Sequence, residues 1–373
     1  MDRIQWKKVK LGEILQVKKG EYITRKEARE GIYPVILGGK EPAYFIDKYN
    51  HSGKAIVISR SGASAGYVSF WNEPIFVTDG FLIEPKDDIT YEFLFYALKS
   101  KQALLHKSQK GAAIPHVTPF LIGDIDFFLP DSTTQHHIAT ALSRYDSLIE
   151  NYQKQIKLLE EAAQRLYKEW FVNLRFPGHE NTKIVDGMPE GWEKKKLVDF
   201  ANVIMGQSPK SEFYNNENKG LPFHQGVGSY GNRFVVDDTY STSYTRIAEP
   251  HSILFSVRAP VGRLNITKNK IVIGRGLSAM THLQGYQSFL FYLLKERFFK
   301  DNIIGNGAIF ASITKDELLN LEFLIASDDL IRRFNSLAKN MDDEIMNADE
   351  QIRLLTEARD RLLPKLMSGE IKV

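Results

Sequence analysis

Residues 93–99 read Phe-Leu-Phe-Tyr-Ala-Leu-Lys, and residues 289–295 read Phe-Leu-Phe-Tyr-Leu-Leu-Lys. The same offset of 196 residues (289 minus 93) relates Gln-Ile-Lys-Leu-Leu at 155–159 to Gln-Ile-Arg-Leu-Leu at 351–355. This period is far above the roughly 20 to 50 residues of solenoid repeats, so each repeat should be a whole domain with a connector. We therefore expect one fold built twice in a single chain, and a function that needs two similar surfaces.

The bulk composition is typical of a folded protein in a reducing compartment. Of the 373 residues, 43% are hydrophobic and 12% are aromatic, which is enough to bury a core in each of two or three domains. Cysteine is absent, which excludes disulfides, thiolate zinc sites and a cysteine nucleophile. The first residues lack the apolar core of a signal peptide, and no run of about 18 apolar residues occurs. We expect a cytoplasmic protein that does not enter the membrane.

The net charge says little about partners. A formal charge of +3 gives a field far weaker than that of a histone-like DNA binder. Lysine and arginine are nevertheless frequent in the first thirty residues, and arginines recur between residues 233 and 275. Most such side chains are simply solvated, so charge alone makes contact with a polyanion the less common outcome.

Each repeat contains both strand and helix patterns. Short apolar runs rich in Val, Ile, Phe and Tyr lie between residues 34 and 85 and between residues 222 and 283, separated by Gly, Ser, Asn and Asp. Such runs are typical of strands joined by turns. Residues 91–107 and 286–299 instead place apolar side chains three and four positions apart, as helices do. We predict an α+β fold with two mixed α/β domains.

The strongest periodicity follows each domain. Apolar side chains from Ile138 to Trp170 recur in steps of four and three, which is the a/d pattern of a coiled coil. Positions 334–366 repeat the pattern in phase, with Arg359 as its one charged residue. Each helix could pack on its own domain, but the length and the in-phase duplication favour two helices that pack on each other. The side chains expected at this interface are Ile149, Ile156, Leu159, Leu166, Ile345, Ile352, Leu355 and Leu362.

The predicted helices set the domain boundaries. A helix of about 33 residues is about 50 Å long. The linker between the first helix and the second domain is rich in Pro and Gly, and its 19 residues could barely travel back along such a helix, so we expect an antiparallel pair. The predicted segments are the first domain at 1–132, the first helix at 133–172, the linker at 173–191, the second domain at 192–327 and the second helix at 328–373.

The sequence predicts neither a catalytic site nor a metal site. Lys54 is followed by Ala55 where a phosphate-binding loop needs a hydroxyl, and no two prolines are adjacent, which excludes the Asn/Asp-Pro-Pro-aromatic motif of amino-methyltransferases. A nuclease motif assembled from residues 130–131 and 193–195 would straddle the long helix and the linker, and we reject it. The adjacent histidines 136 and 137 would point about 100° apart on a helix, unlike a zinc-binding pair.

Two loops, each after a strand, combine arginine with small residues. They are 59–66, Ser-Arg-Ser-Gly-Ala-Ser-Ala-Gly, and 256–262, Ser-Val-Arg-Ala-Pro-Val-Gly. Arginine can bind a phosphate or a guanine, but an arginine that pairs with a local carboxylate is an equally good explanation. Residues 20–25 and 206–210 form a second pair of equivalent loops with different polar residues. Different contacts on one shared fold imply that the two domains recognise different sequences. The candidate DNA contacts are Lys19, Arg25, Arg60, Ser61, Ser64, His116, Gln207, Ser208, Lys210, Arg233, Arg258, Arg263 and Arg275, with a turn as the alternative role of His116.

Together these features resemble the specificity subunits of type I DNA restriction and modification systems. The resemblance covers essentially the whole chain. It rests on the duplication and on several motifs: the Trp-Lys-Leu-Gly style openings at 6–12 and 192–197, the stretches 206–209 and 255–262, and the helix onsets near Gln135 and Ile331. It implies two target-recognition domains, each for one half of a bipartite DNA site, and two helical spacers that fix the distance between them. Recognition loops vary freely in this family, so its base-contacting residues are not carried over to this sequence.

The resemblance also implies the partners and the function. The partners would be double-stranded DNA, methyltransferase subunits, expected to be two, and motor and nuclease subunits. S-adenosylmethionine, ATP and magnesium would be held by those subunits, and this chain would carry no cofactor. The predicted function is non-catalytic: to give sequence specificity to adenine methylation and ATP-dependent cleavage. The alternative is an antirestriction or assembly scaffold that binds methyltransferase subunits.

Overall fold

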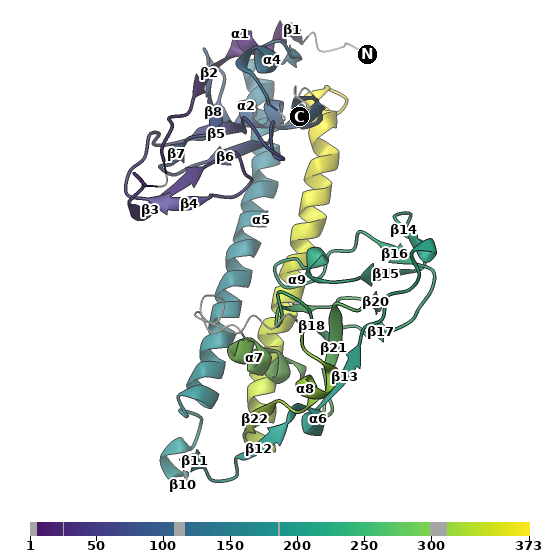
Figure 1. Ribbon diagram of the computed structural model, residues 1–373. Coiled ribbons are helices and arrows are strands. Elements are labelled where there is room, and N and C mark those ends of the chain that lie inside the picture. Colours follow the sequence, from purple (N-terminus) through teal and green to yellow (C-terminus); the bar gives the residue numbers. More distant parts are fainter. Residues whose placement is uncertain (1–5, 25, 108–115, 186, 299–311) are drawn as a thin grey trace. The chain divides into compact units, whose positions relative to one another are not determined.

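The structure is a computed structural model and describes residues 6–24, 26–107, 116–185, 187–298 and 312–373. The chain divides into two compact units, residues 1–153 with 350–373 and residues 154–349. Each unit therefore contains one α/β domain and a part of each of the two long helices (Figure 1).

The first unit is built on a four-stranded antiparallel sheet. In spatial order its strands are β2 (Leu15–Lys19), β8 (Gly80–Pro85), β5 (Ala55–Ser59) and β6 (Val68–Trp71). A smaller sheet has the order β4 (Tyr44–Ile46), β3 (Glu30–Ile36) and β7 (Phe76–Val77), with β3 and β7 parallel. A third, two-stranded pairing joins β1 (Lys7–Lys10) to β9 (Asp126–Leu129). The domain helices are α1 (Leu11–Ile14), α2 (Tyr91–Ser100), α3 (Gln102–Lys107) and α4 (Pro119–Gly123).

The second unit repeats this plan. Its four-stranded antiparallel sheet has the order β13 (Ala201–Met205), β21 (Leu277–His282), β18 (Ile253–Ser256) and β19 (Leu264–Ile266). Its second sheet has five strands, in the order β14 (Tyr214–Asn215), β16 (Tyr240–Ser241), β15 (Leu221–His224), β20 (Ile271–Ile273) and β17 (Ile247–Ala248). A further pairing joins β12 (Glu193–Lys196) to β22 (Glu322–Ile325). The domain helices are α6 (Leu197–Phe200), α7 (Gln287–Phe298) and α8 (Lys315–Leu319), with 3-10 turns at Ser211–Phe213 and Val227–Ser229.

The two units share the strand order of the four-stranded sheet, whereas the second sheet has three strands in the first unit and five in the second. In both units the strand that follows the first short helix pairs with the strand of the four-stranded sheet that comes last in the chain, β2 with β8 and β13 with β21. Each second sheet contains one parallel pair, β3 with β7 or β15 with β20. Strands such as β5, Ala-Ile-Val-Ile-Ser, are buried along their whole length, which explains why they read as continuous apolar runs. The predicted α+β fold with an internal repeat is confirmed.

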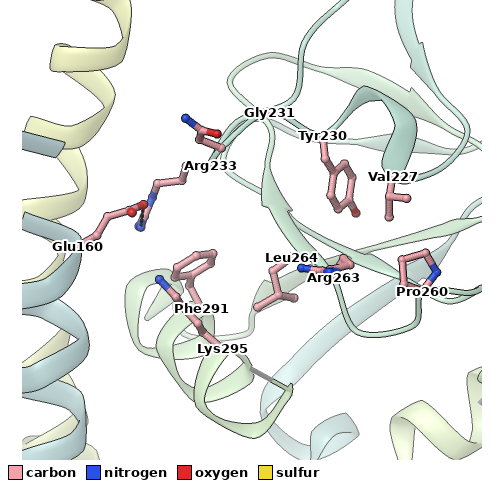
Figure 2. A pocket seen from close by; sticks show the side chains of 11 residues that line it. Glu160, Val227, Tyr230, Gly231, Arg233, Pro260, Arg263, Leu264, Phe291 and Lys295 are labelled. Carbon is pink, nitrogen blue, oxygen red and sulfur yellow. Dashed lines mark hydrogen bonds and ion pairs between the residues drawn. The ribbon is translucent and has the colours of Figure 1, made fainter. Parts of the chain in front are cut away.

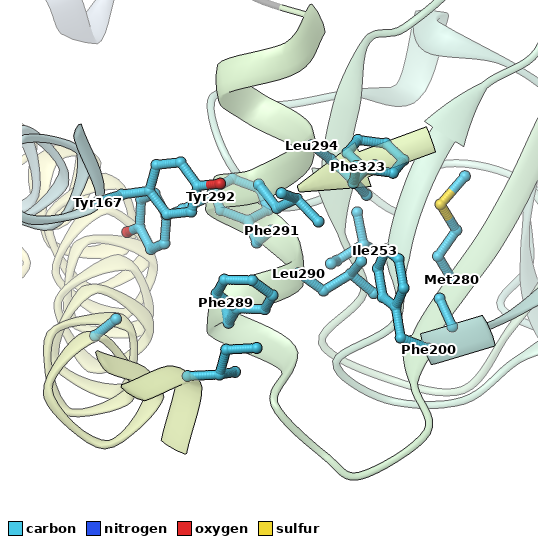
Figure 3. Packing of buried hydrophobic residues seen from close by; sticks show 14 of the residues in the cluster. Tyr167, Phe200, Ile253, Met280, Phe289, Leu290, Phe291, Tyr292, Leu294 and Phe323 are labelled. Atoms are coloured by element: carbon cyan, nitrogen blue, oxygen red, sulfur yellow. The ribbon is translucent and has the colours of Figure 1, made fainter. Parts of the chain in front are cut away.

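The repeated stretch of the sequence forms the helices α2 and α7. The side chain of Thr90 caps α2 by accepting a hydrogen bond from the amide of Phe93 at 3.3 Å. Phe93 and its counterpart Phe289 are both almost fully buried. Figure 3 shows Phe289, Leu290 and Leu294 within the core of the second unit. The helix expected across residues 91–107 is two helices instead, because α2 ends at Ser100 and α3 begins at Gln102. The repeat thus places the same aromatic helix in each core.

The two long helices are α5 (Ser132–Tyr167), which continues as a π-helical turn at Lys168–Val172, and α9 (Asp328–Met367). In the first unit the beginning of α5, with Ile138 and Leu142, shares a core with the end of α9, with Leu366. In the second unit the end of α5, with Tyr167, shares a core with the beginning of α9, with Phe334. The pairing in each unit is that of antiparallel helices, as predicted. Neither these two helices nor any other in the described part of the chain has an apolar run sufficient for a transmembrane span.

The side chains expected at the helix interface differ in their burial. Ile149 and Ile345 are buried. Ile156, Leu159 and Leu166 pack partly buried against the core of the second unit, and Leu362 packs against that of the first. Ile352 and Leu355 have intermediate exposure. The helices also contact their own domains, because the same cores contain residues of α2 and α7.

The segment expected to be a linker, residues 173–191, has local structure of its own. It contains a 3-10 turn at His179–Asn181 and a short hairpin of β10 (Ile184–Val185) and β11 (Met188–Pro189). Phe176 is buried, and its ring lies 5.6 Å from that of Trp192. Part of this segment therefore belongs to the core of the second unit.

Candidate nucleic-acid interface

Three loops of the second unit are joined by hydrogen bonds that backbone amides donate. The amide of Gln207, after β13, donates to the carbonyl of Ile273 at 2.9 Å. The amide of Arg275, between β20 and β21, donates to the Ser208 hydroxyl at 3.3 Å. The amide of Val257, after β18, donates to the carbonyl of Gly276 at 2.9 Å. These bonds bring four of the predicted residues, Gln207, Ser208, Arg258 and Arg275, into adjoining loops.

Glycine is required where these loops approach each other. A Cβ on Gly206 would lie 2.1 Å from the carbonyl oxygen of Gly274, and a Cβ on Gly274 would lie 2.9 Å from the Cα of Gln225. Such distances are impossible without a shift of the backbone. The start of the Gly-Gln-Ser-Pro stretch is therefore set by close packing of the loops, and its polar residues project from a fixed backbone.

The cations of these loops are exposed to solvent. Arg258, Arg275 and Lys210 are exposed, as is Gln207. Neither Arg258 nor Arg275 has an ion pair with any residue that the structure describes. Lys210 lies 3.8 Å from Glu212, and both side chains are solvated, so this contact is worth little. As far as the described residues go, these two guanidinium groups are available to bind a phosphate or the edge of a base.

In the first unit, the arginine of the equivalent loop has a local partner. Arg60 Nε lies 2.6 Å from a carboxylate oxygen of Asp79, and the Ser61 hydroxyl donates to the same carboxylate. Ser61 and His116 form an antiparallel bridge, and the amide of Val117 donates to the carbonyl of Arg60 at 3.0 Å. Arg60, Ser61 and His116 thus lie together, and Asp79 neutralises the cation. This geometry fits the structural explanation for Arg60.

The remaining candidates of the first unit lie nearby or outside the described residues. Lys19 is exposed at the end of β2, opposite Phe81. Ser64 is half-buried, and its carbonyl accepts a hydrogen bond from Tyr67 at 2.9 Å in a turn. Arg25 lies outside the described residues.

The frame of the two loops is the same, although their side chains differ. Arg258 forms an antiparallel bridge with Ser312, as Ser61 does with His116. The amide of Ile313 donates to the carbonyl of Val257 at 2.9 Å, as that of Val117 does to Arg60. Both loops therefore carry an arginine, which pairs with Asp79 in the first domain and is exposed without an ion pair to a described residue in the second.

Arg233 is a correction to the sequence prediction. Its residue is only 5% exposed, and its guanidinium pairs with Glu160 of α5 at 3.1 Å and with Asp342 of α9 at 2.5 Å. The same group lies 4.4 Å from the ring centre of Phe291. A guanidinium enclosed in this way cannot reach a DNA phosphate, so Arg233 is a structural residue.

Arg263 lines a cavity of about 410 Å³ in the second unit (Figure 2). Its residue is exposed, and its amide donates to the Ser256 hydroxyl at 2.8 Å. Lys295 also lines the cavity; burial lowers the pKa of its ammonium group, while Glu160 opposes that shift. The cavity thus contains cations and one carboxylate.

Histidine and carboxylate side chains do not gather into a metal site in the part of the chain that the structure describes. His136 and His137 lie on α5 with ring centres 6.5 Å apart. The buried His224 contacts the Ser229 hydroxyl at 2.8 Å and Asp237 at 2.9 Å, so both ring nitrogens have partners.

The contacts of several residues are not indicated by any motif in the sequence. Asp79 follows a short strand and belongs to no motif, yet it binds both Arg60 and Ser61. A second missed pair, Tyr96 and Asp146, could have been found, because the offset of 196 carries them onto Tyr292 and Asp342. Identity at equivalent positions of the repeat is the signal that identifies such residues.

Comparison with known proteins agrees with this architecture. The profile of the family described as "Type I restriction modification DNA specificity domain" matches residues 3–161 and again residues 189–327. The type I restriction enzyme MjaIX specificity subunit of Methanocaldococcus jannaschii is 29% identical over 86% of this chain and 78% of the relative. The putative MjaX specificity subunit of the same organism is 30% identical over 78% of this chain and 71% of the relative.

A solved structure has the same fold. The crystal structure of a type I restriction-modification system S subunit from M. genitalium matches with a TM-score of 0.65 at 21% identity, over 98% of this chain and 97% of that one. Since the two copies of the family profile together cover more than half of the sequence, this chain belongs to the family of type I restriction-modification DNA specificity proteins.

Proposed function

We propose that this chain is the DNA-recognition subunit of a type I restriction-modification complex, and that each domain reads one half of a bipartite, asymmetric site. The observation that carries the proposal is the duplicated sheet, β2-β8-β5-β6 and β13-β21-β18-β19, with loops of different chemistry at equivalent places. Two copies of one fold whose loops carry different side chains can bind two half-sites of different sequence.

The loops supply the chemistry of recognition. Arg258 and Arg275, both exposed, provide salt-dependent attraction to phosphates, and each can instead pair with the two acceptors of a guanine. Gln207, also exposed, can pair with adenine, and Ser208 orients the backbone at Arg275. In the first domain, Lys19 and the pair Arg60–Asp79 present a different pattern of donors and acceptors.

In this proposal the length of the long helices sets the distance between the two half-sites on the DNA. Helix α5 has 36 residues, which corresponds to about 54 Å at 1.5 Å per residue. Divided by 3.4 Å per base pair, that length sets an upper bound of about 16 base pairs between the centres of the half-sites. The proposal is that the helices hold two reading surfaces at one distance along the DNA.

The catalytic steps belong to partner subunits in this proposal. Methyltransferase subunits bind S-adenosylmethionine and methylate adenine, and motor and nuclease subunits bind ATP and magnesium and cleave the DNA. Leu158 and Leu354, which the repeat offset relates, are 65% and 43% exposed on α5 and α9. We infer that those partners dock on the exposed faces of these two helices.

An exchange of domains tests the proposal. Residues Trp192–Ile325 would be replaced by the corresponding domain of another specificity subunit, and DNA methylated by the assembled complex would be mapped at single-molecule resolution. We expect one half of the methylated motif to change while the other half and the gap stay the same. A change in both halves would contradict it, as would binding to methyltransferase subunits without any sequence preference, which is the behaviour of a scaffold.

A further inference from the structure

A buried tyrosine and an aspartate form the same contact in both units. In the first unit, the Tyr96 hydroxyl of α2 donates to Asp146 of α5 at 2.5 Å. In the second, the Tyr292 hydroxyl of α7 donates to Asp342 of α9 at 2.8 Å. The repeat offset of 196 residues relates Tyr96 to Tyr292 and Asp146 to Asp342. Each contact joins the aromatic helix of a recognition domain to a long helix.

An arginine completes each contact, but it comes from a different part of the chain. In the first unit it is Arg359 of α9, whose Nη1 lies 2.5 Å from Asp146. In the second it is Arg233 of the recognition domain, whose guanidinium binds both Asp342 and Glu160. We name Tyr96, Asp146 and Arg359 the first polar cluster, and Tyr292, Asp342, Arg233 and Glu160 the second polar cluster.

The first cluster explains the charged residue in the a/d pattern. Arg359 stands at the position equivalent to Ala163, which is completely buried. An arginine in an apolar helix interface is costly unless it has a partner. Here Asp146 of the other long helix provides the partner, so the arginine fixes the register of α5 and α9 beside the first domain.

Both tyrosines act as donors from inside the core. Tyr96 is 3% exposed and Tyr292 is fully buried. Burial raises the pKa of both hydroxyls, and the neighbouring carboxylates act in the same direction, so each hydroxyl keeps its proton. Apolar packing alone is tolerant of small rotations, whereas a hydrogen bond between one donor and one carboxylate is directional.

We propose that the two polar clusters are positioning devices that fix the angle of each recognition domain on the long helices, and thereby the gap at which both half-sites are read. This inference rests on the proposed function. The two clusters differ in what they hold: Arg233 ties its domain to both long helices, whereas Arg359 ties the long helices to each other and Tyr96 ties the domain to α5.

The test varies the gap rather than the sequence of the half-sites. Tyr96→Phe and Tyr292→Phe each remove one hydroxyl and keep the ring. Complexes containing these variants would methylate a library in which the two half-sites are separated by the wild-type gap or by one or two base pairs more or fewer. We expect the preference for the wild-type gap to fall about tenfold, the scale of one lost hydrogen bond to a charged group, while the half-site sequences remain the same.

Matched controls separate positioning from loss of stability. Tyr49→Phe removes the hydroxyl of a half-exposed tyrosine that has no hydrogen bond with any described residue. Arg359→Met is compared with Arg361→Met, two residues away on the same helix, where the side chain is 78% exposed. The variants of the polar clusters should weaken the preference for the wild-type gap, and the control variants should not. Arg359→Lys, which keeps the charge, should recover part of the preference.

The outcomes distinguish this inference from the proposed function. If the wild-type complex prefers one gap, and both tyrosine variants methylate less at every gap with the same preference, the clusters only add stability and the inference is wrong. If the wild-type complex shows no preferred gap, the proposed function fails and this inference with it.

Discussion

Arginines of the second domain differ sharply in their burial and their ion pairs. Arg233 is enclosed by Phe291 and two carboxylates, whereas Arg258 and Arg275 are exposed and have no ion pair with a described residue. The partners of Arg233 are 73 and 109 residues away along the chain. A local motif does not contain that information, so the sequence alone could not separate the structural arginine from the exposed ones.

Replacement of Arg233 should destabilise the second unit. In Arg233→Met, Asp342 and Glu160, whose side chains are 16% and 30% exposed, lose this cation, which typically costs about 3 kcal/mol. Urea unfolding should show this loss, with a change below about 0.5 kcal/mol for the exposed control Arg275→Met. Equal stabilities of the two variants would mean that the buried ion pairs contribute nothing.

Replacement of Arg258 should affect DNA binding and leave stability unchanged. The side chain is exposed and unpaired among the described residues, so Arg258→Ala removes one cation from the proposed reading surface. If it binds a phosphate, the slope of log K against log salt concentration should fall by about one, with weaker binding to every sequence. The control is Arg175→Ala, whose side chain is 69% exposed and pairs with Glu169. An unchanged affinity and slope for Arg258→Ala would remove this residue from the interface.

His282 should make the second unit sensitive to acid. Burial lowers the pKa of its imidazole to about 4, whereas an unfolded histidine titrates near 6.5. The folded state therefore resists protonation, so its stability is complete above pH 6.5 and declines as the pH falls from 6.5 towards 4. After allowance for solvent screening, the loss is about 2 kcal/mol.

The variant His282→Asn lacks this titration. Thermal unfolding between pH 7.5 and pH 4.5 should show a smaller loss of stability for His282→Asn than for the wild type. His137→Asn, at an exposed position of α5, should follow the wild type. Parallel curves for all three proteins would contradict the assignment.

At the scale of elements, periodicity decides what can be predicted. The long helices were evident from the sequence because burial on a helix recurs every three or four residues, and this pattern extends over most of α5 and α9. The sequence does not predict three features: the break of the α2–α3 segment at Lys101, the π-helical turn at Lys168–Val172 and the β10–β11 hairpin. Each is a local deviation that no repeating pattern marks.

Shortening both long helices by one heptad should change the gap and not the half-sites. Deleting Ile149–Gln155 together with the equivalent Ile345–Gln351 keeps the a/d pattern in phase, because Ile156 and Ile352 take over the vacated positions. Seven residues at 1.5 Å each move the reading surfaces by about 10 Å, or about three base pairs. Methylation mapping should therefore show a shorter gap between unchanged half-sites. An unchanged gap would show that the helices do not set the distance.

At the scale of the whole molecule, the duplication made the architecture predictable. Two related runs, at 93–99 and 289–295, were enough to predict two domains of one fold, and the repeated sheet order bears this out. The parallel pairings of β3 with β7 and β15 with β20 could not be predicted, because they join strands about 40 to 50 residues apart with no matching pattern. The contacts of Asp79 and Arg233 were hidden for the same reason, since they depend on tertiary packing.

In the proposed function, one chain reads two half-sites at a set separation. The most direct test of this function is single-molecule methylation mapping of genomic DNA from a host that contains this chain and its partner subunits. We expect one two-part motif in which a single gap separates two different sequences, with half-site centres no more than about 16 base pairs apart. A continuous motif, or half-sites methylated equally well at many separations, would contradict it.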